Sequence, residues 1–181
     1  KAGGAPSASN SNTSGAMTAN SVSVDGTLQA AYTPSGSPDI YPNKMSINTE
    51  AGFSIVNYTG TATLGDTIPH GFSSKPDLLI VKNISSAESW AVWSSIFTAA
   101  SETLFLNADA TSSTWTNRFG TVDDTTFQAG VNGDPEVNAP SDGMIAYVWK
   151  SIPGYSLIGS YTGTGSATDS PKIYTGFEPA W

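Results

Sequence analysis

The chain has 181 residues, with seven Lys and Arg against fifteen Asp and Glu, which gives a formal net charge of −8 at pH 7. Charged residues make up only 12% of the chain, about half of the roughly 25% that is typical of globular proteins. So few helix-forming and basic side chains argue against long helices and against binding to a nucleic-acid backbone. The lack of cysteine excludes a disulfide scaffold and a cysteine zinc site. No apolar run approaches the ~20 residues of a membrane span, so we expect no membrane insertion.

Residues 1–43 are rich in Gly, Ser, Asn and Pro and show no sustained periodicity. We interpret them as an extended arm or linker that becomes ordered on a neighbouring subunit, where adding a strand to the neighbour's sheet would satisfy its backbone groups. Plain disorder is the alternative. Within this range, SVSVDGTLQAAY predicts a short strand with a turn at Asp25 and Gly26. The three prolines between residues 34 and 42 then mark a loop, because proline cannot lie in the middle of a sheet.

Residues 44–150 alternate short apolar runs with turn signals. The runs KMSINT, GFSIVNYT, PDLLIVKNI, ESWAVWSS, ETLFLNA and GMIAYVWK are bounded by Gly, Pro, Asp or Ser, as strands are. LLIV and MIAYVW are apolar at consecutive positions, which predicts strands that are covered on both faces. We therefore predict an all-β unit here, an antiparallel β-sandwich of jelly-roll type. A short helical turn in AVWSSIFTAASETL is the alternative for that stretch, because Trp93, Ile96 and Phe97 have helical spacing.

The stretch GYSLIGSYTGTG, which begins at Gly154, repeats GFSIVNYTGT, which begins at Gly52. After one inserted glycine the YTGT segments coincide, and further on TGF at residues 175–177 aligns with HGF at residues 70–72. Self-similarity of this kind indicates an array whose units bury a face against their neighbours. We therefore expect residues 151–181 to open a second unit, and the chain to be a window onto a longer protein. Two strands that merely share YTG are the alternative.

Several segments between residues 43 and 181 match one known pattern when they are taken together: GFSIVNYTGT, IPHGFSSKPDLLIVKN, WAVW, LFLN, GMIAYVWK, GYSLIGSYTGTG and YTGFEPAW. They resemble the repeat domain of long virion-associated proteins of marine tailed phages. The resemblance implies a location in the virion, in a tail, fibre or head appendage, and it brings no catalytic activity with it. It implies as partners other virion proteins and copies of this chain, with trimers common among phage fibres. The chain departs from the pattern at Phe72, where Leu is usual, and at Trp93, where Tyr followed by His is usual.

Residues that could carry catalysis are few. His70, the single histidine, lies between Pro69 and Gly71, so we interpret it as a turn residue rather than a base; no G-x-S-x-G motif is present. Paired carboxylates could hydrolyse a polysaccharide if they faced each other across a cleft. The acidic clusters lie in polar, turn-rich stretches, so we interpret them as solvated loop charges and predict no catalytic residue. These clusters are Asp123 with Asp124, Asp134 with Glu136, and Asp142.

Two binding sites remain as hypotheses. Trp115, in SSTWTNRFG, is the best candidate for an exposed aromatic ring, and with Asn117 and Arg118 it would form a shallow site for a sugar. Oxygen ligands on loops suit calcium, although the spacing here matches no EF-hand loop. The calcium ligands would be Asp134, Glu136 and Asp142, and no other cofactor is expected.

Three functions follow from these observations. The first is a structural virion module without catalysis, which assembles with itself or with other virion proteins. The alternative is an adhesin module of the same appendage that binds a glycan of the host surface. A polysaccharide hydrolase is the least favoured, because it needs an acid pair in a groove.

Overall fold

The computed structural model describes residues 4–98, 102–108, 118–130 and 134–179. Its regular elements in these ranges are eleven strands, which confirms the predicted all-β class. The stretch from Trp90 to Ser94 forms a strand, so the helical alternative does not hold there. The described ranges contain no helix, and therefore no helix that could cross a membrane.

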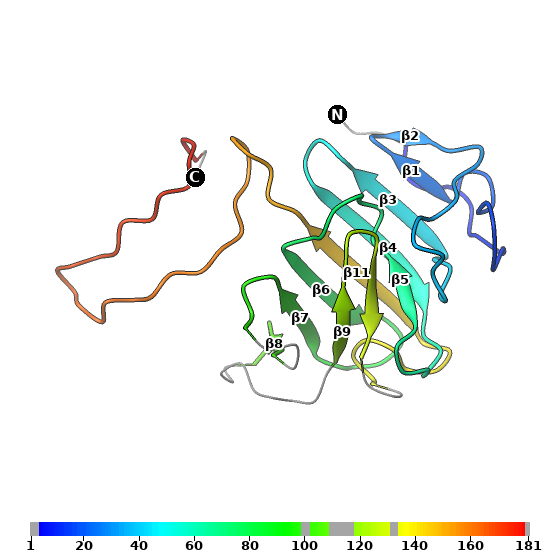
Figure 1. The fold of residues 1–181 in the computed structure, drawn as a ribbon. Coiled ribbons are helices and arrows are strands. Elements are labelled where there is room, and N and C mark those ends of the chain that lie inside the picture. The colour runs from blue at the N-terminus through cyan, green and yellow to red at the C-terminus, as the bar shows by residue number, and fades with distance from the viewer. Residues whose placement is uncertain (1–3, 99–101, 109–117, 131–133, 180–181) are drawn as a thin grey trace.

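The larger sheet contains eight strands in the order β2-β1-β3-β4-β11-β6-β7-β8 (Figure 1). Each neighbouring pair is antiparallel except β1 and β3, which run parallel, so the sheet is mixed. The last strand in sequence, β11, lies at the centre, because it pairs with both β4 and β6. The strand bounds are β1 Val22–Val24, β2 Thr27–Leu28, β3 Lys44–Asn48, β4 Phe53–Thr59, β6 Leu78–Asn83, β7 Trp90–Ser94, β8 Leu104–Phe105 and β11 Gly143–Trp149.

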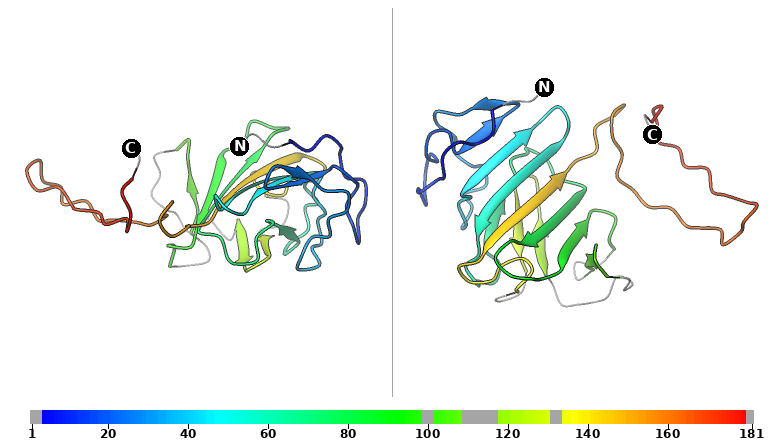
Figure 2. Two further views of the ribbon diagram at one scale, coloured as in Figure 1. Left: turned by 90° about the horizontal axis from the view of Figure 1, so that it is seen from above. Right: turned by 180° about the vertical axis from the view of Figure 1, so that it is seen from behind.

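The smaller sheet lies over one face of the larger sheet, and together they form the predicted sandwich (Figure 2, left). Its strands pair antiparallel in the order β5-β10-β9. They are β5 Thr67–Pro69, β10 Thr126–Ala129 and β9 Phe119–Val122. Pro69 ends an edge strand, a position where its missing N–H leaves no ladder hydrogen bond unmade.

The core lies between the two sheets, and the central strands of the larger sheet contribute alternate residues to it. β4, β6 and β11 bury every second side chain, since successive residues of a strand point to opposite faces. Tyr58 of β4 spans the layers: its ring meets Phe127 edge-on, with centroids 6.1 Å apart, and its hydroxyl donates to the Val137 carbonyl oxygen at 2.7 Å. Other core side chains are Val56, Ile68, Leu79, Val81, Phe119, Met144, Ala146 and Val148.

The outer face of the larger sheet, which points away from the smaller sheet, is only half-buried along β4, β6 and β11. Seen from behind, no sheet or helix of the described residues covers this face (Figure 2, right). The prediction that LLIV and MIAYVW are covered on both sides is therefore wrong for this face, although both runs bury their inner side chains. The large apolar side chains of the outer face are Phe53, Ile55, Leu78, Ile80, Trp90, Ile145, Tyr147 and Trp149.

From Gly4 onward, the segment that the sequence assigns to an arm folds onto its own sheet. The predicted turn at Asp25 and Gly26 is confirmed, because both have positive φ (48° and 80°) and they connect the antiparallel strands β1 and β2. Met17 is 3% exposed and belongs to the core. The N–H of Asn10 donates to the Asn43 carbonyl oxygen at 2.8 Å, which ties the segment to the start of β3. In this structure the backbone groups of the arm thus find partners within the same chain.

Residues 151–179 leave the sandwich at the end of β11 and run outward from it (Figures 1 and 2). A short bridge between Ile152 and Ser156 forms a turn at their start. Beyond it, up to residue 179, the segment forms no strand. It exposes five large apolar side chains, which are Tyr155, Leu157, Tyr161, Ile173 and Tyr174.

Candidate functional site

Arg118, just before β9, lies inside a buried cluster of charges. Its Nη1 donates to Asp134 Oδ2 at 2.6 Å and to Glu136 Oε2, and its guanidinium stacks over the Phe105 ring, 4.9 Å from the centroid. The side chains of Arg118, Asp134 and Glu136 are 11%, 6% and 10% exposed. The guanidinium that was predicted to bind a sugar is therefore turned inward and paired with two carboxylates. Its predicted companions Trp115 and Asn117 lie outside the described residues.

Asp134 also shapes the backbone beside Tyr58. Its Oδ1 accepts hydrogen bonds from the backbone N–H groups of Glu136 at 3.0 Å and Val137 at 3.2 Å. Burial raises the pKa of Asp134 to about 6. The positive charge of Arg118 opposes this rise, and the neighbouring Glu136 carboxylate adds to it. Because Val137 in turn accepts the Tyr58 hydroxyl, the charged cluster fixes a loop that closes the core.

The third predicted calcium ligand, Asp142, has partners of its own. Its Oδ2 accepts hydrogen bonds from Asn83 Nδ2 and Ser86 Oγ, both at 2.8 Å, and these bonds lower the pKa of Asp142. The structure thus brings Asp134 and Glu136 together around Arg118 and ties Asp142 to the end of β6. Across the ranges that the structure describes, no three His, Cys, Asp or Glu side chains gather into a group that could hold a metal ion.

His70 and the Asp123–Asp124 pair hold the turns at one end of the sandwich. The fully buried imidazole accepts the Phe72 N–H at Nδ1 (3.2 Å), so Nε2 carries the proton and donates to the Asp123 carbonyl oxygen (3.2 Å). Burial lowers the pKa of His70. The Asp123 carboxylate accepts the N–H groups of Thr125 and Thr126, both at 2.8 Å. These groups serve turn geometry, as the sequence suggested for His70.

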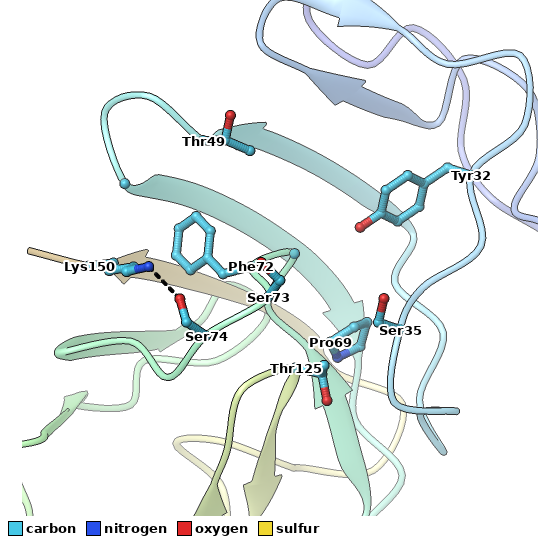
Figure 3. A pocket seen from close by; sticks show the side chains of 11 residues that line it. Tyr32, Ser35, Thr49, Pro69, Phe72, Ser73, Ser74, Thr125 and Lys150 are labelled. Atoms are coloured by element: carbon cyan, nitrogen blue, oxygen red, sulfur yellow. Dashed lines mark hydrogen bonds between the residues drawn. The ribbon is translucent and has the colours of Figure 1, made fainter. Parts of the chain in front are cut away.

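A polar cavity of about 210 Å³ opens beside this turn, where β4 begins and β5 and β11 end (Figure 3). The loop between β2 and β3 supplies one wall and the β9–β10 turn another. Lys150 Nζ donates to Ser74 Oγ at its rim, and the Phe72 ring lies between them and Tyr32. The lining residues are Tyr32, Ser35, Thr49, Gly52, Pro69, Gly71, Phe72, Ser73, Ser74, Thr125 and Lys150.

The walls of this cavity are fixed by hydrogen bonds and close backbone approach. The Asp39 carboxylate accepts both the N–H of Thr67 (3.0 Å) and its hydroxyl (2.7 Å), which ties the β2–β3 loop to β5. Gly52 has φ +60°, a conformation that favours glycine, and a Cβ there would lie 2.5 Å from the Lys150 carbonyl oxygen. The start of β4 and the end of β11 therefore meet backbone to backbone beside the cavity.

Sequence reasoning missed this cavity. Five of its eleven lining residues are Ser or Thr from four separate loops, and such residues are common in turns of any β-protein. The one local sequence signal for this part of the molecule is the turn at His70 and Gly71, which indicates only that a strand ends there. Long-range pairing of β4 with β11 brings Thr49, Gly52 and Lys150 together. This pairing cannot be predicted from the spacing of residues along the sequence.

Comparison with known proteins gave one result. No curated protein and no solved structure matched the chain. A family profile matches it over its full length, residues 1–181. The chain therefore belongs to the family described as Domain of unknown function (DUF7483).

Proposed function

We propose that this protein is a non-catalytic structural module of a phage virion, part of a tail fibre, head fibre or other appendage. It assembles with copies of itself or with other virion proteins. The observation that carries this proposal is the half-buried aromatic outer face of the larger sheet. Soluble monomers rarely expose contiguous apolar patches of this kind, and such patches mark sites of association.

Four aromatic rings form a row across β4, β11 and β7 on the outer face. The Phe53 and Trp149 centroids are 5.0 Å apart, Trp149 and Tyr147 are 6.3 Å apart, and Tyr147 and Trp90 are 6.4 Å apart. Because consecutive rings lie next to one another, the row forms one continuous aromatic surface, which Leu157 and Phe177 of the C-terminal segment border beside Phe53 and Trp149. A neighbouring module that covered this row would complete the two-sided burial that the sequence predicts.

The segment after β11 supports an arrayed arrangement. Gly154 and Gly176 have φ of 76° and 81°, and their counterparts in the first copy, Gly52 and Gly71, have 60° and 86°. At both aligned positions the glycines of the two copies therefore share a positive φ. In our proposal, residues 151–181 open a second unit, and their exposed apolar side chains are the beginning of its core.

The acidic side chains support a non-catalytic role. Asp134 and Glu136 pair with Arg118, Asp123 caps a turn, and Asp142 binds Asn83 and Ser86. Each carboxylate stabilises local structure, and none of them lines the polar cavity.

Antibody labelling tests the location of the protein. An antibody raised against the chain, followed by gold labelling and electron microscopy, should mark an appendage of phage particles that encode it. Gold confined to host debris, with bare particles, would contradict a virion role.

Sedimentation velocity tests assembly. We expect the chain to self-associate, and Tyr147→Lys to weaken this association at least tenfold by placing a charge in the aromatic row. The matched control is Thr121→Lys, which adds the same charge at an exposed position of β9 on the smaller sheet. A chain that is monomeric at high concentration, or equal effects of the two variants, would contradict an assembly role for the outer face.

A second candidate function is binding of a host-surface glycan. The predicted contacts at Trp115 and Asn117 stay a prediction, and the paired Arg118 guanidinium gives them no support. The observation that favours this function is the polar cavity beside Lys150.

A further inference from the structure

The cavity beside Lys150 has the dimensions of a site for one small polar molecule. Its volume of about 210 Å³ equals that of about seven molecules of liquid water, which is the size class of a single sugar ring. It is open to solvent at the end of the sandwich, where Tyr32, Phe72 and Lys150 reach it from three different segments (Figure 3). A ligand could therefore enter without movement of the strands.

The lining combines hydroxyl groups with aromatic rings. Six of the eleven lining residues carry a hydroxyl. The hydroxyls of Thr49 and Thr125 donate to the carboxylates of Asp25 (2.7 Å) and Asp123 (3.1 Å). The hydroxyls of Tyr32, Ser35 and Ser73 can donate one hydrogen bond to a ligand and accept others. Burial raises the pKa of Tyr32, so its phenol stays neutral and can donate. The ring of Phe72 adds an apolar wall. A molecule with many hydroxyl groups and apolar C–H faces, such as a sugar, matches both features. The hydroxyl-bearing residues are Tyr32, Ser35, Thr49, Ser73, Ser74 and Thr125.

The charge of the lining differs in sign from the charge of the chain. The chain has fifteen acidic and seven basic residues, but the cavity lining contains Lys150 and no acid. Lys150 has three N–H donors, and its hydrogen bond to Ser74 uses one of them. The ammonium group can therefore donate to a carboxylate at the cavity rim while it keeps its hydrogen bond to Ser74.

We propose that this cavity binds an acidic sugar, a uronic acid unit of a glycan, with its carboxylate at Lys150 and its ring between Tyr32 and Phe72. The inference rests on the second of the two proposed functions and does not depend on assembly through the outer face. Lys150 and Ser74 hold the anion, and the hydroxyls of Tyr32 and Ser35 lie beside the ring. Only one cation is available, so a lone inorganic anion would be held more weakly than the sugar acid.

Titration of the full chain with sodium glucuronate, followed by NMR, tests the proposal. We expect saturable shifts with a Kd of about 1 mM, which corresponds to roughly 0.3 kcal/mol for each ligand heavy atom. Glucose should bind at least tenfold more weakly, and acetate and sulfate should give no saturable shifts at the Phe72 and Thr125 amides. Absence of shifts with glucuronate, or equal affinity for acetate or sulfate, would overturn the proposal.

Two variants locate the site. Lys150→Met keeps the stem of the side chain and removes the charge, and we expect at least a tenfold loss of glucuronate affinity. Lys172→Met, an exposed lysine of the C-terminal segment, is the matched control and should change nothing. If Lys150→Met alters the fold, Tyr32→Phe replaces it, with an expected threefold loss. Unchanged affinity in a folded Lys150→Met or Tyr32→Phe chain would overturn the proposal.

A glycan array separates failure of this inference from failure of glycan binding in general. Binding confined to uronate-containing glycans supports the cavity assignment. Binding of neutral glycans alone overturns it but leaves the second candidate function standing. An array with no bound glycan overturns both.

Discussion

β4 and the segment that begins at Gly154 have closely similar sequences and opposite surroundings. Tyr58 of β4 is fully buried between the two sheets, whereas Tyr161, its counterpart in the repeat, is 67% exposed. β4 pairs with β3 on one side and β11 on the other, and the described residues after 156 pair with no strand. The comparison shows that alternation of apolar and polar residues allows a segment to form a strand. The strand forms only where neighbouring strands pair with the segment and a second sheet covers it.

The largest expected effect contrasts the two tyrosines. Tyr58→Ala removes a core ring and its hydrogen bond to Val137, so we expect a loss of about 4 kcal/mol in the free energy of unfolding. Tyr161→Ala should change it by less than about 0.5 kcal/mol, as exposed substitutions usually do. Urea unfolding measures both. Equal losses would mean that the second segment is buried in solution.

Tyr58→Phe sharpens this contrast, because it keeps the ring and removes only the hydroxyl. We expect a loss of about 1–2 kcal/mol, since the Val137 carbonyl oxygen is left without its buried donor. Tyr161→Phe is the matched control and should be neutral.

The next effect contrasts two glycines of the YTG motif. A Cβ at Gly60 would overlap the carbonyl oxygen of Ala139, whereas nothing lies within 4 Å of one at Gly163. We expect Gly60→Ala to cost about 2–3 kcal/mol through overpacking, and Gly163→Ala to be close to neutral. Thermal unfolding compares the two. A neutral Gly60→Ala would show that the loop at Ala139 yields easily.

His70→Thr introduces threonine, the residue found at the aligned position 175 of the repeated segment. The pKa of buried His70 is lowered, so the unfolded chain binds the proton first, and stability falls as pH drops below about 6.5. We expect the variant to be less stable at pH 8 by about 1–2 kcal/mol, because it loses hydrogen bonds to Asp123 and Phe72. It should also lose this acid-dependent destabilisation. Urea unfolding at pH 5, 6 and 7 tests both effects.

Asp134 acts in the opposite direction over the same pH range. Its folded pKa of about 6 lies above the ordinary value of 3.8, so the folded chain holds the proton more tightly. This contribution to stability therefore grows as pH falls from about 6 to about 4. Asp134→Asn should remove it and leave the His70 effect, so that stability falls more steeply on acidification. A shallower fall than in the parent chain would contradict the raised pKa.

The smallest effect is expected at the start of the two segments. Phe53→Tyr introduces into β4 the residue type found at the aligned position, Tyr155. The ring of residue 53 is half-buried against Trp149 on the outer face. The added hydroxyl can reach solvent, so we expect a change below about 0.5 kcal/mol in unfolding experiments. A larger loss would show that this ring position is already covered.

Much of the fold could be predicted from local pattern. Alternation and turn residues gave the strands that became β3, β4, β6, β7 and β11, and Asp25-Gly26 gave the turn between β1 and β2. The parallel pairing of β1 with β3 could not be predicted, because it depends on how residues 4–43 return to the sheet. The candidate site was harder still. Arg118 looked like a surface cation, and only the fold shows that it lies between Asp134 and Glu136.

By itself, the sequence determined the all-β class, the low charge and the positions of most strands, because these follow from side-chain alternation and turn chemistry within a few residues. The tertiary structure decided which face of each strand is covered, since a run such as LLIV is apolar on both sides and the second layer lies on one. It also decided that Lys150 meets Tyr32, Thr49 and Phe72 around a cavity. Those residues are far apart along the chain. The pairing of β11 with β4 brings Lys150 beside the β3–β4 turn, and the hydrogen bonds between Asp39 and Thr67 hold the loop of Tyr32 against β5.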